Sequence, residues 1–339
     1  MLNCGIALTI DGKVIGRVLD VKRLSVKFKT KHGVVQAVSD VSLHLDKGRI
    51  LGIVGESGSG KSTVLNAILR LLPEKDVLLE GQIIYEGTDL FTLSPPAMRA
   101  VRGKEISMIF QDPMTTLNPV YNIGNQIAES LKVHGLYRGR ERERVFELMR
   151  EVGIPSPESR VREYPHQFSG GMQQRAIIAI ALACEPKLLL ADEPTTALDV
   201  TIQAQIVELL RKINRTHHTS IILVTHNLAL ASDLCEEIAV MYAGRIVEKG
   251  PAEVILQDPR HPYTRGLLSA VPLPGITRGT RLATIPGTVP DLADLPPGCA
   301  FHPRCPLALE ECARLAPEPV ETGDRHTLWC RREIKEGAA

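Results

Sequence analysis

The chain has 339 residues, of which 44% are hydrophobic and 23% charged, and its formal net charge is +1. This length predicts about two domains, and the composition is that of a globular protein with a proper core. The near-neutral charge argues against a basic surface of the kind that binds nucleic acids or anionic membranes. We expect no signal peptide, and the longest apolar run, 176–184, is far shorter than the roughly 20 residues that cross a bilayer. Any membrane role must therefore come through partner chains.

In chain order, residues 1–20 are expected to form a short extension without predicted structure. Alternating apolar residues within 19–44 predict antiparallel strands. The apolar run 50–55 predicts a buried strand, 62–72 predicts a helix ended by Pro73, and 81–87 predicts another strand bounded by glycines.

The segment between the buried strand and the helix fits G-x-x-x-x-G-K-[ST] without a mismatch. Its glycines let backbone N–H groups turn toward phosphate oxygens, and the helix N-terminus adds partial positive charge. Lys61 would reach the β- and γ-phosphates, and the Ser62 hydroxyl would ligate magnesium. A glycine-rich turn without a ligand is the alternative, which the flanking strand and helix disfavour. The expected nucleotide-binding residues are Gly55, Glu56, Ser57, Gly58, Ser59, Gly60, Lys61, Ser62 and Thr63.

Residues 112–175 differ in character, because 126–133 and 141–152 carry apolar residues at helical spacing. We predict a helical insertion between core strands. The core then resumes with apolar runs at 187–191 and 220–225, separated by a helix at 200–215. A strand, a helix and a strand of these lengths predict a parallel βαβ unit.

Two carboxylates, Asp192 and Glu193, follow an apolar strand. Adjacent strand residues point to opposite sides, so we expect Asp192 to face magnesium and Glu193 to polarise the attacking water. A helix-capping pair before Pro194 is the alternative, and the phosphate loop makes it the weaker one.

Two further polar residues follow predicted strands. His226 comes after 221–225 and could contact the γ-phosphate or orient the water, whereas Gln111 comes after 106–110 and could touch the metal or the water. Strand ends that converge on one ligand are the expected geometry of an α/β phosphate site. Gln111 also stands where the insertion begins, which makes it a candidate sensor of nucleotide state.

Ser169 is a good N-cap for a helix predicted at 173–184, and Gly170 and Gly171 leave that helix N-terminus bare for an anion. With this S-G-G motif, residues 20–255 resemble an ATP-binding-cassette (ABC) ATPase. In that family two subunits meet head-to-tail, and each ATP lies between one phosphate loop and the other subunit's S-G-G helix. The resemblance implies ATP and Mg²⁺ as cofactors.

The resemblance also implies residue roles, which are the general base for Glu193, the switch histidine for His226 and the hinge glutamine for Gln111. It places 196–199, with Asp199, across the dimer seam and Phe28 under adenine. Phe168 and Met172 stand where Leu and Gln are commoner, but the serine and glycines that face the anion are intact.

The implied fold is α/β. It comprises a P-loop NTPase core of ABC ATPase type with an antiparallel β subdomain and a helical insertion, plus a small loop-rich C-terminal domain. The expected divisions are an N-terminal extension (1–20), a nucleotide-binding domain (21–258) with its helical subdomain (112–175), and a C-terminal domain (259–339). Proline rises sharply in this tail, which we expect to lie outside the sheet.

Three segments, 111–119, 261–264 and 298–306, resemble the ATPase subunits of bacterial dipeptide, oligopeptide and nickel importers. This resemblance implies a related second ATPase subunit, two membrane subunits and an external substrate-binding protein, at the cytoplasmic face of the cell membrane. Peptide is the first expected cargo and nickel the second. A DNA- or ribosome-associated ATPase would need a long coiled-coil insertion or two cassettes in one chain, plus a basic surface, and none of these is expected from this sequence. A non-catalytic regulatory cassette would have a damaged phosphate loop or lack Glu193, and both are intact.

Four of the seven cysteines, Cys299, Cys305, Cys312 and Cys330, are separated by five, six and seventeen residues. Four thiolates suit zinc or an iron–sulfur cluster, but the tight pairs usual for structural zinc are missing. The importer resemblance favours a structural [4Fe-4S] cluster, with zinc and free or oxidised thiols as alternatives. Cys4, Cys184 and Cys235 are interpreted as ordinary buried or stray thiols.

Overall fold

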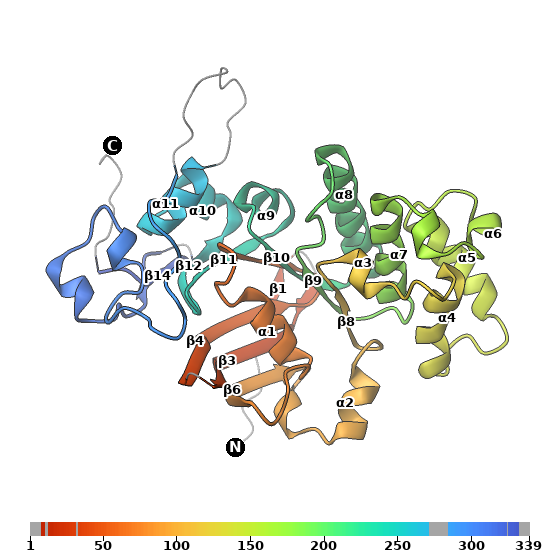
Figure 1. Ribbon diagram of the computed structural model, residues 1–339, viewed down its shortest axis with the longest axis horizontal. Helices are drawn as coiled ribbons and strands as arrows, with labels where there is room; N and C mark the ends of the chain where they lie inside the picture. The colour runs from red at the N-terminus through yellow and green to blue at the C-terminus, as the bar shows by residue number, and fades with distance from the viewer. Residues whose placement is uncertain (1–7, 11–12, 32, 271–283, 324, 332–339) are drawn as a thin grey trace. The chain divides into compact units, whose positions relative to one another are not determined.

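The computed structural model describes residues 8–10, 13–31, 33–270, 284–323 and 325–331 (Figure 1). The chain divides into two compact units, each assembled from separate stretches. The first unit comprises Met1–Leu19, His44–Arg49 and Ile84–Ile222, and the second comprises Asp20–Leu43, Ile50–Ile83 and Leu223–Ala339.

The first unit contains the strands β8 (Ile106–Ile109) and β9 (Leu188–Asp192), which pair in parallel with Ile109 opposite Ala191. Both are wholly buried, as expected of strands covered on two faces. The helices of this unit are α2 (Pro95–Val101), α3 (Pro113–Thr116), α4 (Ile123–Val133), α5 (Glu141–Glu151), α6 (Pro157–Arg160), α7 (Gly170–Leu182) and α8 (Val200–His217).

The helices α3 to α7 of the first unit gather into one group, yellow to green in Figure 1. Helices α4, α5 and α7 pack against one another, and α7 also packs against β8. Leu131, Leu148 and Ile178 are fully buried, so the apolar periodicity of the sequence makes the core of this group. The predicted helical insertion is therefore confirmed as a helical region.

The second unit contains β5 (Ile50–Val54), which pairs in parallel with β11 (Glu237–Tyr242). Strand β11 pairs antiparallel with β12 (Arg245–Pro251), and the described parts of β4, β3, β6 and β7 (Thr88–Asp89) form another sheet in that order. The remaining elements of the second unit are α1 (Lys61–Ile68), α9 (Leu228–Leu234), α10 (Ala252–Gln257) and α11 (Pro262–Ser269). Four strands contribute residues to both units, namely β3 (Arg17–Thr30), β4 (Gly33–Asp46), β6 (Val77–Tyr85) and β10 (Ser220–Thr225).

Several predicted boundaries are confirmed and others are wrong. The strands predicted at 50–55, 106–110 and 220–225 agree with β5, β8 and β10 to within a residue. The helix predicted to reach 72 ends at Ile68, because Arg70 adopts a left-handed conformation (φ 50°). The strand predicted to begin at Gly81 begins at Val77, and it runs through that glycine (φ 98°).

The prediction that the tail lies outside the sheet is wrong. Strand β14 (Thr327–Leu328) pairs antiparallel with β12, and β13 (Val320–Glu321) pairs with β14. Loops and two short 3₁₀ turns, His302–Arg304 and Glu310–Ala313, nevertheless make up most of the rest of the described tail.

The N-terminal extension, for which no structure was predicted, includes β1 (Leu8–Ile10) paired antiparallel with β2 (Lys13–Ile15). Cys4 and the prolines at 272 and 274 lie outside the described residues. Among the described helices, none combines the length and the apolar character needed to cross a bilayer.

Candidate functional site

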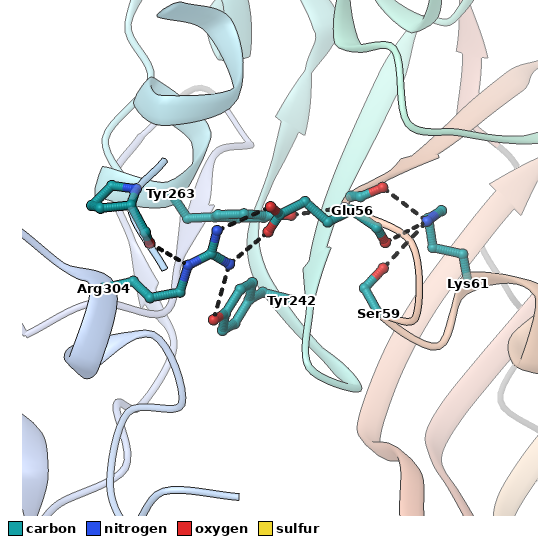
Figure 2. Close-up of polar contacts among 8 residues, drawn as sticks. Glu56, Ser59, Lys61, Tyr242, Tyr263 and Arg304 are labelled. Carbon is teal, nitrogen blue, oxygen red and sulfur yellow. Dashed lines mark hydrogen bonds and ion pairs between the residues drawn. The ribbon is translucent and has the colours of Figure 1, made fainter. Parts of the chain in front are cut away.

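The phosphate loop connects β5 to α1 in the second unit. Figure 2 shows the Lys61 ammonium donating to the carbonyl oxygens of Gly55 and Glu56, at 2.8 Å each, and lying 3.4 Å from the Ser59 hydroxyl. The Lys61 side chain is buried although it begins a helix. Its charge is thus held against the loop that would surround a phosphate.

Two glycines of the loop are required by close packing. A Cβ at Gly55 would overlap the carbonyl oxygen of Met241 in β11, and a Cβ at Gly60 would overlap that of Ala37. Gly60 also has φ 95°, which disfavours any other residue. The loop backbone is therefore pressed against neighbouring strands, and only glycine fits at these positions.

Glu56 ties the loop to the C-terminal tail within the second unit. Its backbone N–H donates to the Tyr263 hydroxyl at 2.8 Å, and its carboxylate accepts from two guanidinium nitrogens of Arg304 at 2.8 and 3.0 Å (Figure 2). The phosphate-loop motif predicted a nucleotide-binding role for Glu56, whereas no motif indicated the part of Tyr263 and Arg304. Both lie in segments that carried the importer resemblance, which was the only available signal.

The two predicted carboxylates stand at the end of β9 in the first unit. Asp192 is the last strand residue and is buried, whereas Glu193 is partly exposed and adopts a left-handed conformation (φ 45°). Such strain in a residue other than glycine is typical of functional sites. That the two side chains face different groups remains a prediction.

Thr196 and Gln111 both contact the Glu193 carboxylate. The Thr196 hydroxyl donates to it at 2.8 Å, and the Gln111 amide lies 3.4 Å from the same oxygen. Gln111 follows β8, the strand paired with β9, so the predicted meeting of these two strand ends is confirmed.

The S-G-G motif begins helix α7, also in the first unit. Ser169 is the N-cap, and its hydroxyl accepts from the Met172 N–H at 3.4 Å. The helix begins at Gly170 and not at the predicted Gln173, because both glycines take helical conformations after this cap. Ser169 and Gly170 are exposed, so the helix N-terminus is open to an anion.

Asp199 caps α8 by accepting from the Ile202 N–H at 2.9 Å, and its side chain is exposed. Phe28 lies half-buried in β3, and His226 is exposed directly after β10. The predicted nucleotide residues therefore belong to both units. The meeting of the phosphate loop, Ser62 and Asp192 at one metal ion remains a prediction.

The four tail cysteines line one cavity, together with Phe301 and His261. Burial raises the pKa of the Cys299 thiol, and the neighbouring thiols of Cys312 and Cys305 raise it further. Four thiols on one cavity are the right donors for a cluster or for zinc. At the distances in the structure, however, no three His, Cys, Asp or Glu side chains of the described chain form a metal-holding group.

Two other cysteines are buried, as predicted. Burial raises the pKa of Cys184 to about 11, and it also raises that of Cys235. Neither thiol has the lowered pKa that marks a reactive cysteine.

Comparison with known proteins agrees with this geometry. Residues 38–196 match the family model of the ABC transporter, and residues 247–312 match that of the oligopeptide/dipeptide transporter C-terminal region. A dimeric, post-hydrolysis structure of the ATP-binding cassette MJ0796 with ADP and Pi superposes with a TM-score of 0.62, at 28% identity over 69% of this chain and 98% of that one.

Similarity to curated proteins extends over nearly the whole chain. The oligopeptide transport ATP-binding protein OppD of Bacillus subtilis is 50% identical, over 92% of this chain and 88% of that protein. The dipeptide transport ATP-binding protein DppD of Haemophilus influenzae is also 50% identical, over 94% and 96%. The protein belongs to the ABC transporter family of ATPases, in the branch that carries the oligopeptide/dipeptide transporter C-terminal region.

Proposed function

We propose that this chain is the ATP-hydrolysing subunit of a bacterial ABC importer of di- and oligopeptides. The proposal is supported by a phosphate loop with a buried lysine and a held glutamate in a chain that also carries an importer-type tail. The phosphate loop holds a buried lysine, and Glu193 is oriented by Thr196 and Gln111. The curated relatives named above are peptide transport proteins, and they support peptide as the cargo.

In the proposed mechanism, Lys61 and the loop N–H groups bind the β- and γ-phosphates, and Phe28 stacks on adenine. Ser62, Gln111 and Asp192 would hold Mg²⁺, which neutralises the phosphate charge. Glu193 accepts a proton from water as its oxygen bonds to the γ-phosphorus, and the bond from that phosphorus to the bridging oxygen breaks. The products are ADP and inorganic phosphate.

The site would be completed by a second ATPase subunit, with the Ser169 helix end of one subunit capping the nucleotide on the other. ATP would thus join the two subunits, and hydrolysis would release them. His226 would contact the γ-phosphate and Asp199 the seam. We favour a related but different chain as the partner, on the family resemblance.

Membrane subunits would contact the segment that follows Gln111. Met114, Val120 and Tyr121 are 80%, 72% and 55% exposed, which is unusual for apolar side chains so close together in the chain. A groove of about 640 Å³ lies beside α4 and α5. Asn122, which lines this groove, directly follows Tyr121 in the chain. Such contacts would place the protein at the cytoplasmic face of the membrane, where an external binding protein delivers the peptide to the membrane subunits.

The experiment is uptake by the complex reconstituted in vesicles from this chain and its co-purified partners. We expect ATP-dependent uptake of labelled di- and oligopeptides, lost with Glu193→Gln. Nickel uptake without peptide uptake would establish the second candidate cargo instead.

We also propose that Cys299, Cys305, Cys312 and Cys330 hold a [4Fe-4S] cluster with a structural role. The support is their place on one cavity in a tail composed mostly of loops. Bound there, the cluster would supply cross-links between loops that have little apolar core of their own.

A further inference from the structure

We infer that Arg304 is a positioning residue of the nucleotide site, through which the cysteine-rich tail sets the charge and the shape of the phosphate loop. The inference rests on the proposed nucleotide site and extends it to the C-terminal domain. It starts from the ion pair between Arg304 and Glu56, two residues 248 positions apart in the chain.

The ion pair is more buried than a typical surface ion pair, and it has bidentate geometry. The Arg304 side chain is only 6% exposed and that of Glu56 29%, and the two nitrogens of the guanidinium each meet one carboxylate oxygen. Bidentate pairs of this kind fix orientation as well as charge. A third guanidinium nitrogen donates to the Pro286 carbonyl at 2.9 Å.

Aromatic rings enclose Arg304. Its guanidinium carbon lies 5.8 Å from the ring centre of Tyr242 and 6.0 Å from that of Phe301. Tyr242, Tyr263 and Phe301 pack mutually, with ring centres 4.7 to 5.4 Å apart. Because these rings exclude water, the pair is less screened than an exposed one.

Glu56 lies in the loop itself. Its backbone carbonyl accepts from the Lys61 ammonium, while its N–H donates to the Tyr263 hydroxyl. The tail therefore holds this residue by both its main chain and its side chain. Displacement of Glu56 would displace a carbonyl that positions the phosphate-binding lysine.

Charge gives the pair a second consequence. A carboxylate in a loop that binds anionic phosphates would repel the ligand unless it is neutralised. Arg304 supplies that neutralisation, and it does so from the turn His302–Arg304, which lies between two thiols of the cavity, Cys299 and Cys305. The conformation of the tail around Arg304 is thus coupled to the affinity of the phosphate loop for nucleotide.

The test is the dissociation constant of a fluorescent ATP analogue (mant-ATP) for the full chain. Arg304→Ala should weaken binding about tenfold, within the usual range of coupling between sites. Arg304→Lys should recover part of the affinity, because an ammonium restores the charge without the bidentate geometry. Arg304→Ala combined with Glu56→Gln should recover most of it, since the unpaired carboxylate is gone.

Arg314→Ala is the matched control, because Arg314 is an arginine of the same tail whose partner, Glu310, is 84% exposed. It should leave the affinity unchanged. Thermal unfolding and thiol content are measured for every variant, so that a misfolded tail is recognised. A purely structural role would lower the melting temperature in Arg304→Ala without rescue of affinity by Glu56→Gln, and that result would overturn the inference.

Hydrogen exchange gives a readout independent of affinity. At saturating nucleotide, exchange in 299–312 should slow in the parental chain, because coupling between two sites is reciprocal, and should change less in Arg304→Ala. Equal slowing in both would also overturn the inference. A parental chain that binds no mant-ATP would instead refute the proposed nucleotide site.

Discussion

The side-chain amide of Gln111 donates to the Glu193 carboxylate across 3.4 Å, from the ends of two neighbouring parallel strands. The register of β8 and β9 sets Ile109 opposite Ala191, so the residues that follow each strand emerge side by side. The hydroxyl of Thr196, three residues after Glu193, donates to the same carboxylate oxygen. Glu193 is thus held by contacts from within its own unit, which suits the general base that we propose it to be.

Replacement of Glu193, the proposed base, should separate turnover from binding. Glu193→Gln keeps the size of the side chain and one acceptor oxygen for Thr196 and Gln111, but its neutral amide does not take up a proton, so we expect ATP hydrolysis to fall by about 10²-fold or more. Binding of mant-ATP should persist, because the phosphate loop is untouched. Hydrolysis near the parental rate would remove Glu193 from the role of base.

Glycine at position 60 should be indispensable for binding. In Gly60→Ala the new Cβ would overlap the Ala37 carbonyl oxygen at φ 95°, so the loop must shift and ATP binding should be lost. Gly87→Ala is the control, because Gly87 has φ 85° but open space around its Cβ position. It carries the backbone strain alone, and equal loss of binding in both variants would contradict the packing argument.

We predict that the cavity lined by the four tail cysteines binds an iron–sulfur cluster. Anaerobically purified protein should be brown and contain about four iron and four sulfide per chain. Cys312→Ser should lose the colour, whereas Cys184→Ser should keep it, since Cys184 lies elsewhere, on the helical side of the first unit. Colourless, iron-free parental protein with a protease-resistant tail would refute the cluster.

His261 predicts sensitivity to acid. Burial lowers its pKa to about 4, although Glu248, which accepts from the backbone N–H of His261 and contacts His326, favours the charged form. The unfolded chain, with a histidine pKa near 6.5, therefore binds this proton more readily. The free energy of unfolding should fall as pH drops from about 6.5 to about 4, by on the order of 3 kcal/mol in total.

The control for that effect is His261→Asn. In the native chain the ring nitrogen Nδ1 accepts from the Tyr263 N–H as the N-cap of α11, and an asparagine oxygen can replace it. This variant should keep its stability near pH 7 and lose part of the decline in acid, measured by urea unfolding at several pH values. An unchanged pH profile would show that another group is responsible.

The sequence predicted those structures that depend on residues close together in the chain. The phosphate-loop motif encodes its own strand, turn and helix, and the polar residues at 111, 192 and 193 were found because strand ends are readable from apolar runs. The pairing of Arg304 with Glu56 could not be predicted, because no periodicity links positions so far apart. Strand β14, with two residues, is too short to leave an alternating pattern, which explains the wrong prediction for the tail.

The central claim is that ATP lies at a seam between two ATPase subunits. The most direct measurement is a structure of the Glu193→Gln complex with its partner ATPase subunit, trapped with ATP. We predict that Lys61 contacts the phosphates of one nucleotide, while Ser169 of this chain contacts the γ-phosphate of the nucleotide held by the partner subunit. A trapped complex in which each nucleotide touches one subunit only, with the Ser169 helix end far from both, would contradict the account.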